Sequence, residues 1–378
     1  MAALSEGQIR LLHFQDGSSE DAIQLELRTY NRAEVPAYTA LSYGWGRPKN
    51  PGSIRVNGVA RGVRRNLCDA LKHLPSHTTG PFWVDAICID QKNAKERNDQ
   101  VRAMGEIYSG AALVLAWLGL VDDNIRPCFA SNGQESLAVV RAARKALVGR
   151  QYWTRLWVYQ ELVLAKQIRI TCGHYSMGYS DLETLLWNVD ADYDAQRICY
   201  AVSRGPTYDL CEALAQFSTC KCADERDRIF AVLSIVKEDQ RVSLLRILPL
   251  YSTPVPRLVE AAREHINELR SRDVVSYELF IRASTALTQM HTGSIKYSQA
   301  VSLEPVDTPR QFSPQIVDPA FNPAYAPLQS PRPRDAADMS NYTRDKKAPM
   351  GSHKSQQYMV VDLGLETVET VTLGTDRR

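Results

Sequence analysis

The chain has 378 residues, with 45 Lys and Arg against 43 Asp and Glu, a formal net charge of +2, and 44% hydrophobic residues. This composition is that of a soluble globular chain with enough apolar side chains for one large domain or two. The near-neutral charge, and the lack of a basic stripe of useful length, argue against a nucleic-acid partner.

Several residue types are unevenly distributed along the chain. All six Trp fall between Trp45 and Trp187, and all eight Cys fall between Cys68 and Cys222. Nine of the nineteen Pro lie between Pro305 and Pro349. We therefore expect the packed, working part of the protein in about the first 235 residues.

The chain carries no recognisable targeting or membrane signal. Its N-terminus lacks the basic and apolar regions of a signal peptide, and its longest apolar run, Ala111 to Leu118, is far shorter than the roughly 20 residues of a membrane helix. The Cys residues stand mostly in apolar contexts and show no CxxC pair, which indicates reduced core thiols and no structural zinc. We expect a cytoplasmic protein with no membrane partner and no bound metal.

The first part of the chain predicts short strands. Apolar and polar residues alternate over 9–12 and 23–27, which predicts two strands joined by the turn at 16–19. A third strand is predicted over 38–43, leading into a Gly-Trp-Gly loop. Residues 54–63 predict a hairpin turning at Asn57-Gly58. We expect Asn66 to cap the helix that follows.

The next part predicts an α/β domain. The nearly continuous apolar run 82–89 is typical of a strand buried on both faces of a parallel sheet. A helix ending at Gly110 and a second buried strand over 111–118 follow it. This alternation predicts parallel strands with right-handed crossovers. Further helices are expected over 137–147, 153–165, 208–217 and 228–236 and beyond 258, with a strand over 168–172.

These patterns divide the chain into four parts. Residues 1–37 are expected to form an N-terminal hairpin that packs on the main domain, which covers 38–236. Residues 237–302 are expected to form a helical extension. Residues 303–378 are rich in Pro and lack apolar periodicity, so we expect a largely disordered linker or tail.

The common fingerprints of cofactor and catalytic sites are absent. The chain has no Gly-Lys dipeptide, and therefore no P-loop. It also lacks GxGxxG after the first strand. The motifs HExxH and GxSxG are missing too, which argues against the common zinc proteases and the nucleophile-elbow hydrolases.

Some polar residues stand where apolar ones are expected. Asp85 and Asp90 flank the end of the second buried strand, and a buried carboxylate is costly unless it is paired. Glu161 shares a helix face with Trp157. Each could be a structural ion-pair or capping residue or a working carboxylate. The charged run 224–228 could likewise be a solvated helix cap or a functional cluster.

Three segments together resemble the HET (heterokaryon incompatibility) domain of filamentous fungi. They are Tyr38-Thr-Ala-Leu-Ser-Tyr-Gly-Trp-Gly46, Phe82-Trp-Val-Asp-Ala-Ile-Cys-Ile-Asp-Gln91 and Trp153-Thr-Arg-Leu-Trp-Val-Tyr-Gln-Glu161. A fourth, Asp224-Glu-Arg-Asp-Arg-Ile-Phe-Ala-Val-Leu233, follows in the order of the family. The resemblance implies a role in non-self recognition and programmed cell death after hyphal fusion, or in a secondary-metabolite gene cluster.

The HET domain is in turn distantly similar to the TIR domain, which has a flavodoxin-like parallel sheet. Ser42-Tyr43 and Trp157-Val-Tyr-Gln-Glu161-Leu162 match two TIR motifs, with Val158 in place of a Cys. In TIR enzymes this Glu is the catalytic residue of NAD cleavage. The resemblance therefore implies that Glu161 is catalytic, with NAD as a substrate and no bound cofactor.

The physical case for this chemistry is simple. Nicotinamide is a good leaving group, so the enzyme mainly has to hold the ribose and stabilise an oxocarbenium-like transition state with negative charge. Ligands of open α/β sheets bind at the carboxyl ends of the strands. We expect the substrate-binding residues there to be Ser42, Tyr43, Gly44, Trp45, Gly46, Asp85, Asp90 and Trp157.

Two other functions stay open at this level. The first is a non-enzymatic TIR-like module that associates with itself as a homo-oligomer and responds to an upstream recognition protein. The second is an accessory protein of a secondary-metabolite biosynthetic pathway.

Overall fold

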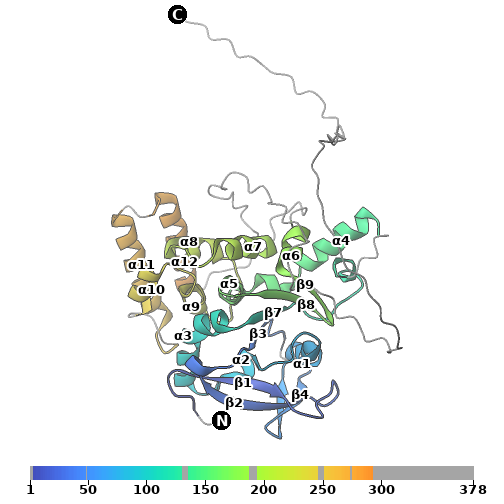
Figure 1. Ribbon diagram of the computed structural model, residues 1–378. Coiled ribbons are helices and arrows are strands. Elements are labelled where there is room, and N and C mark those ends of the chain that lie inside the picture. The colour runs from blue at the N-terminus through green and yellow to red at the C-terminus, as the bar shows by residue number, and fades with distance from the viewer. Residues whose placement is uncertain are drawn as a thin grey trace, which may run out of the picture. The chain divides into compact units, whose positions relative to one another are not determined.

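The computed structural model describes residues 3–47, 49–129, 135–186, 194–245, 251–272 and 275–292 (Figure 1). Its contacts divide the chain into two units, Met1–Val306 and Asp307–Arg378. The Pro-rich tail predicted over 303–378 lies outside the described residues. The boundaries predicted at residues 37 and 236 stay predictions.

Within the described residues, nine strands form one sheet in the spatial order β5-β4-β2-β1-β6-β3-β7-β8-β9. The strands are β1 (Gln8–Phe14), β2 (Gln24–Asn31), β3 (Thr39–Tyr43), β4 (Gly52–Val56), β5 (Val59–Val63), β6 (Phe82–Trp83), β7 (Leu113–Trp117), β8 (Ile168–Cys172) and β9 (Tyr175–Gly178). The middle of the sheet, β6-β3-β7-β8, is parallel. The chain passes from β3 to β6 on one side and then crosses to β7 on the other. Such a reversal of strand order marks the crevice where open sheets bind ligands.

The sheet is mixed, which corrects the expectation of a parallel one. The pairs β1-β2, β4-β5 and β8-β9 are antiparallel, as is β1 with β6. For the three pairs of consecutive strands the reason lies in the short connections, because a strand that follows a short turn returns antiparallel. Asn57 and Gly58 both have positive φ, 51° and 76°, as the predicted hairpin turn requires.

The run 82–89 is not one long strand, and this prediction was wrong. Only Phe82–Trp83 pairs in the sheet, and Asp85–Cys88 forms a helical turn, α2. The Oδ1 atom of Asp85 accepts the backbone N–H of Ala86 at 2.6 Å. A buried strand and a buried helical turn both give apolar runs, so periodicity alone cannot separate them.

Two helix predictions also need correction. Helix α1 (Arg65–His73) begins two residues earlier than expected, with Arg64 at its N-cap, so Asn66 lies inside the helix and does not cap it. The helix predicted over 153–165 is broken at Arg155, whose backbone is extended. Arg155 forms a bridge with Lys221, and this strand-like pairing separates a 3-10 turn (Gln151–Thr154) from α5 (Trp157–Val163).

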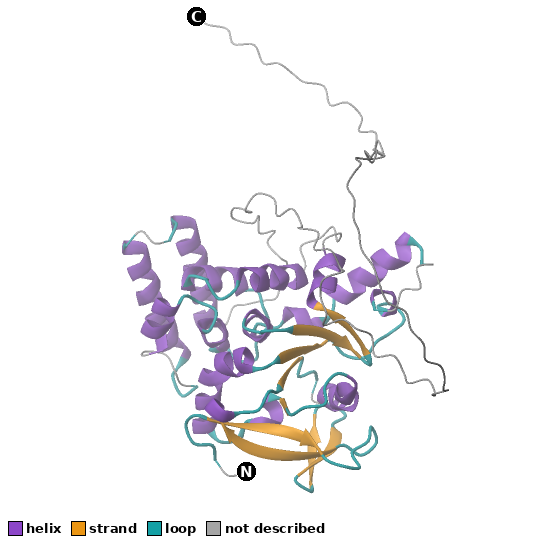
Figure 2. Ribbon diagram, viewed as in Figure 1, coloured by secondary structure: helices purple, strands orange, loops and turns teal. Residues whose placement is uncertain are grey.

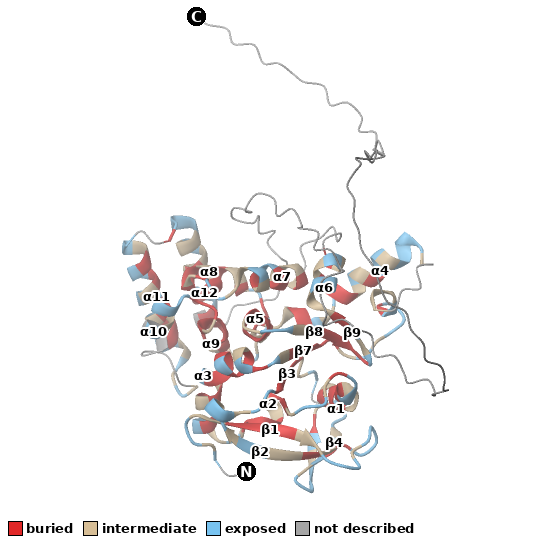
Figure 3. Ribbon diagram, in the orientation of Figure 1, coloured by how far each residue is buried: buried red, intermediate tan, exposed pale blue. Residues whose placement is uncertain are grey.

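The remaining helices are α3 (Ala94–Gly110), α4 (Leu137–Val148), α6 (Tyr179–Leu186), α7 (Asp194–Arg204), α8 (Leu210–Phe217), α9 (Asp227–Leu233), α10 (Glu238–Leu245), α11 (Val255–Ser271) and α12 (Tyr277–Thr292). Figure 2 shows that the later helices gather on one side of the sheet. Short α5 packs against α3, α7 and α9. Figure 3 shows continuous burial from β3 and β7 into α5 and α9, so α5 lies in the core between sheet and helices.

Two further findings bear on the sequence predictions. No helix in the described ranges is long and apolar enough to cross a bilayer. Six of the eight Cys are buried, as predicted for core residues.

Candidate functional site

The predicted acidic residue of α5 lies deep in the protein. Six of the seven residues of α5 are buried, and Glu161 is only 3% exposed. Its Oε2 atom accepts a hydrogen bond from the hydroxyl of Ser42, the fourth residue of β3. Its Oε1 atom lies 3.4 Å from Nη2 of Arg155. Glu161 therefore links the central strand of the sheet to the loop that enters α5.

A second hydroxyl extends this network. The Ser42 Oγ atom lies 2.6 Å from the hydroxyl oxygen of Tyr152, which is buried. Because Ser42 has a single hydroxyl proton and donates it to Glu161, the Tyr152 hydroxyl donates to Ser42. The three groups form a directed chain from Tyr152 through Ser42 to Glu161. Such a chain strengthens the negative end at the carboxylate.

Arg155 lies between two carboxylates. It pairs with Glu161, and it interacts electrostatically with Asp85. Its Cδ atom lies 3.8 Å from the position that a Cβ atom would take on Gly44, so the side chain runs beside the loop after β3. Its Nη1 atom is buried without a hydrogen-bond partner among the described residues.

The loop after β3 is held by side chains from two other segments. Nε1 of Trp45 donates to Oδ2 of Asp85 at 2.8 Å. Nδ2 of Asn66 donates to the carbonyl oxygen of Gly44 at 2.5 Å, and Oδ1 of Asn66 accepts from Nε1 of Trp117 at 3.0 Å. Gly46 adopts φ of 70°, a conformation that favours glycine. The Gly-Trp-Gly loop is thus fixed at the carboxyl end of β3.

Burial sets the electrostatics of both acids. It raises the pKa of Glu161, and the charge of Arg155 and the hydrogen bond from Ser42 oppose that shift. It also raises the pKa of Asp85, against the hydrogen bond from Trp45 and the charge of Arg155. Two buried acids that share one cation form a compact polar centre inside an apolar core.

Comparison with known proteins identifies the segment that carries this centre. The sequence model of the "Heterokaryon incompatibility protein (HET)" family matches residues 38–161. Residues 38–161 are a HET domain. The matched segment begins just before β3 and ends at Glu161, so it contains both partners of the Ser42–Glu161 hydrogen bond.

One curated relative of the HET-domain chain is "Heterokaryon incompatibility protein 6, OR allele" of Neurospora crassa. It is 30% identical over an alignment of 225 residues, which covers 44% of this chain and 33% of the relative. The chain thus spans about a third of the length of this relative. No solved structure matches the chain.

Most of the predicted site residues of the HET domain meet around Arg155. Ser42, Gly44 and Asp85 contact or face this cluster as described above. Tyr43 is 3% exposed, and burial together with the nearby Asp85 raises the pKa of its hydroxyl. The carboxyl end of β3 therefore contributes several residues to the candidate site.

Two of the predicted site residues, Asp90 and Trp157, have their side-chain partners outside this cluster. Oδ1 of Asp90 accepts the backbone N–H of Lys92, and the backbone N–H of Asp90 donates to Glu96 at 2.7 Å. Trp157 interacts with Asp227 of α9. Among the described residues, no side-chain hydrogen bond or ion pair joins Asp90 or Trp157 to the Glu161 carboxylate.

The structure also adds two members that the sequence did not single out as site residues. Tyr152 is 110 residues from its partner Ser42, and no local pattern links the two. Asn66 has the signal of a helix cap but holds Gly44 and Trp117 together instead. Arg155 stands in the motif 153–161, but the sequence pattern gave it no predicted role in the site.

Asp227 forms a second buried acidic position next to the HET domain. Burial raises its pKa to about 6, although hydrogen bonds from Tyr251 and Trp157 oppose the shift. The Tyr251 hydroxyl donates to Oδ1 of Asp227 at 2.6 Å. This places the predicted charged run 224–228 beside α5, where Asp227 holds Trp157 at the start of the helix.

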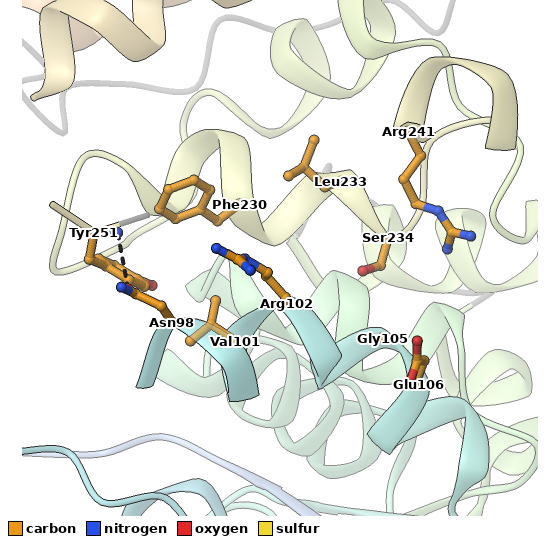
Figure 4. A pocket seen from close by; sticks show the side chains of 10 residues that line it. All are labelled: Asn98, Val101, Arg102, Gly105, Glu106, Phe230, Leu233, Ser234, Arg241 and Tyr251. Atoms are coloured by element: carbon orange, nitrogen blue, oxygen red, sulfur yellow. Dashed lines mark hydrogen bonds between the residues drawn. The ribbon is translucent and has the colours of Figure 1, made fainter. Parts of the chain in front are cut away.

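A hollow of about 150 Å³ lies between α3 and α9 (Figure 4). Its lining combines apolar, amide and charged side chains: Asn98, Val101, Arg102, Gly105, Glu106, Phe230, Leu233, Ser234, Arg241 and Tyr251. None of these residues contacts Glu161 in the network described above. The hollow is therefore separate from the Ser42–Glu161 centre.

Proposed function

We propose that this chain acts in fungal non-self recognition and cell-death signalling, and that its HET domain does so by cleaving NAD. The name of the Neurospora crassa relative supports the first part, and so does the match of residues 38–161 to the HET family. The observation that carries the second part is the Ser42–Glu161 hydrogen bond, which holds a buried carboxylate at the carboxyl end of the central strand.

The chemistry required is the rupture of the bond between nicotinamide and ribose. The electron pair of the C1′–N bond goes to nicotinamide, which leaves as a neutral molecule. A water molecule bonds to C1′ and loses one proton, so the products are nicotinamide, ADP-ribose and a proton. The positive charge that develops on the ribose needs a fixed negative charge beside it, and Glu161 in its ionised form supplies one.

The geometry assigns further roles in this reaction. Ser42 and Tyr152 hold the Glu161 carboxylate in one orientation, so it needs no reorganisation during the reaction. The Trp45 ring offers a flat surface for nicotinamide or adenine. Arg155 covers the carboxylate, and its side chain is 20% exposed against 4% for Glu161. Substrate entry therefore requires Arg155 to turn away from Glu161.

The resemblance of the Glu161 motif to TIR enzymes supports the same chemistry. The spatial order of the parallel strands, β6-β3-β7-β8, is compatible with a flavodoxin-like core to which hairpins have been added. We propose on this basis that the HET domain is a relative of the TIR domain.

A second candidate function rests on the same ion pair. Glu161 is buried and engaged by Arg155, as a purely structural acid would be. In that case the HET domain is a non-enzymatic signalling module that works by association with other copies or with a partner. Removal of the carboxylate would then lower the stability of the protein and leave no enzymatic signature.

One experiment separates these candidates. The purified full chain is incubated with NAD, both in solution and clustered on a scaffold, and nicotinamide release is followed. We expect release from the wild type and a loss of at least about a hundredfold in Glu161→Gln, because the ionised group is the main source of transition-state stabilisation. Glu212→Gln is the matched control, since it removes a carboxylate from the Arg204 ion pair outside the cluster.

Thermal unfolding of each variant accompanies the assay. A Glu161→Gln protein that stays folded and inactive supports catalysis by Glu161. If neither form of the wild type releases more nicotinamide than Glu161→Gln, the enzymatic proposal fails and the signalling module takes its place.

A further inference from the structure

The segment next to the candidate site carries an unbalanced positive charge. Between residues 47 and 68 the chain has six basic residues and no Asp or Glu: Arg47, Lys49, Arg55, Arg61, Arg64 and Arg65. They are spread over a loop, a hairpin and the start of a helix, so they form no continuous run in the sequence. The fold brings Arg64 to the loop that holds Trp45, and it brings Arg61 to α2, whose Asp85 accepts the hydrogen bond of Trp45.

Arg64 borders this loop on one side. Its Nη1 atom donates to the carbonyl oxygen of Gly46 at 2.7 Å. Its guanidinium carbon lies 5.1 Å from the centre of the Trp45 ring, which is within the range of a cation–π contact. The positive charge of Arg64 is thus held against the aromatic surface that the proposed substrate would use.

Arg61, in β5, contacts helix α2, which holds the loop through Asp85. Its Nη2 atom donates to the carbonyl oxygen of Ala86 at 2.9 Å, next to Asp85. Arg61 pairs in register with Ile54, which is buried, so its side chain lies on the inner face of the hairpin. Arg64, at the N-cap of α1, thus lies against the Trp45 ring, and Arg61 binds the backbone next to Asp85, the hydrogen-bond partner of Trp45.

Both arginines keep their charge uncompensated. Each one donates to backbone carbonyl oxygens, which carry no net charge. Among the described residues, neither forms an ion pair with a carboxylate, whereas Arg65 pairs with Asp69 and Arg155 pairs with Glu161. Two fixed, partly buried guanidinium groups without an anion are suited to bind one, and planar guanidinium matches phosphate best.

We propose that Arg61 and Arg64 form a subsite for the pyrophosphate of a dinucleotide, beside the ring of Trp45. This inference rests on the proposed function and specifies its substrate class: a nicotinamide compound that carries a pyrophosphate, as opposed to the free nucleoside. The pyrophosphate binds at the outer edge of the Gly-Trp-Gly loop. The ribose that carries nicotinamide then extends inward to Glu161.

The test measures binding of ADP-ribose to the full-length protein by calorimetry, so that it does not depend on turnover. We expect Arg61→Gln and Arg64→Gln each to weaken binding at least about tenfold, as loss of a charged hydrogen bond does. Arg64→Lys should recover part of the affinity because it keeps the charge. Arg55→Gln is the matched control, since Arg55 lies on the same hairpin and donates to the carbonyl of Gly58, at the turn.

Two further ligands test whether the arginines bind the pyrophosphate as part of a dinucleotide. Nicotinamide riboside should bind equally to the wild type and to both variants, because it has no phosphate. Inorganic pyrophosphate should compete with ADP-ribose only weakly if the Trp45 ring also contributes. Pyrophosphate that binds as tightly as ADP-ribose would overturn the assignment to a dinucleotide.

The outcomes for this subsite and for catalysis are distinct. Arginine-dependent binding of ADP-ribose without nicotinamide release would support the subsite and refute NAD cleavage. Nicotinamide release with an unchanged KM for NAD in both arginine variants would support NAD cleavage and overturn the subsite. Equal weakening by Arg55→Gln would also overturn it, because the effect would then be one of general charge.

Discussion

The hydroxyl of Ser42 in β3 donates a hydrogen bond to the carboxylate of Glu161 in α5, across 119 residues of chain. The two residues lie near opposite ends of the segment that matches the HET family, 38–161. One buried hydrogen bond therefore joins the two ends of the segment that matches the family. This contact links the central strand to the helix that the later helices cover.

We expect Ser42→Ala to lower the free energy of unfolding by about 1.5–3 kcal/mol, since it takes a donor from a buried charged group. Urea unfolding at pH 7 measures this change. In a Glu161→Gln background the same substitution should cost clearly less, because the charged acceptor is already gone. If the free-energy cost of the double variant equals the sum of the two single costs within about 0.5 kcal/mol, the two residues are not coupled.

The buried pair of Arg10 and Glu96 should control stability in acid. Burial by itself would raise the pKa of Glu96, but hydrogen bonds from Arg10 and from the backbone amides of Asp90 and Leu4 lower it to about 2. The folded pKa is below that of the unfolded chain, so this stabilisation is complete above about pH 4.5 and is lost as the pH falls towards 2.

Glu96→Gln should therefore lose about 3 kcal/mol at pH 7, as expected when one partner of a buried pair is removed. Its stability should also fall less steeply than that of the wild type between about pH 4.5 and pH 2. Guanidinium unfolding at several pH values measures both effects. Parallel pH profiles for the two proteins would contradict the assignment.

The contribution of Asp227 to stability should depend on pH in the opposite direction to that of Glu96. Burial raises its pKa to about 6, against hydrogen bonds from Tyr251 and Trp157. The folded pKa is above the unfolded value, so the contribution of this group to stability is present below about pH 4 and is lost as the pH rises through about 6. The shift of about two pKa units corresponds to about 3 kcal/mol.

Asp227→Asn keeps an oxygen that can accept from Tyr251 but cannot ionise. We expect its free energy of unfolding to change less than that of the wild type between pH 4 and pH 7. Chemical unfolding at these two pH values is the measurement, with Glu225→Gln as a control on the neighbouring half-buried ion pair with Arg228. A wild-type profile retained in Asp227→Asn would refute the prediction.

Close packing of α3 on α9 should make Gly105 sensitive to substitution. A Cβ atom at this position would lie 2.5 Å from Oγ and 2.8 Å from Cβ of Ser234. Gly105→Ala should therefore cost about 1–3 kcal/mol through overpacking, measured by thermal unfolding. Gly105→Ala with Ser234→Gly should regain most of the loss, because the second change removes both clashing atoms. The absence of such recovery would place the strain elsewhere.

Local patterns in the sequence predicted many elements of this fold. The hairpin at Asn57-Gly58, the strand at 38–43 and the helix ending at Gly110 follow from turn chemistry and periodicity, which act over a few residues. The family segment and its acid at Glu161 were also visible as motifs. These features need no knowledge of distant parts of the chain.

Other features depended on contacts between distant segments. The run at 82–89 became a helical turn, and the helix expected over 153–165 broke at Arg155 because Lys221 pairs with its backbone. Asn66 does not cap the helix as expected, because its side chain is hydrogen-bonded to Gly44 and Trp117. In each case a hydrogen-bond partner brought by the tertiary fold outweighed a local preference.

The sequence by itself determined the α/β class, the HET segment and the residue types available for chemistry, because these follow from local patterns and motifs. Only the tertiary structure decided that Ser42, Tyr152 and Arg155 surround Glu161, and that Arg64 lies against Trp45 while Arg61 binds α2 next to Asp85. The physical reason is that burial and pairing of charge depend on side chains that are far apart in the chain. The near-neutral net charge of +2 conceals both the buried acids and the local excess of arginine.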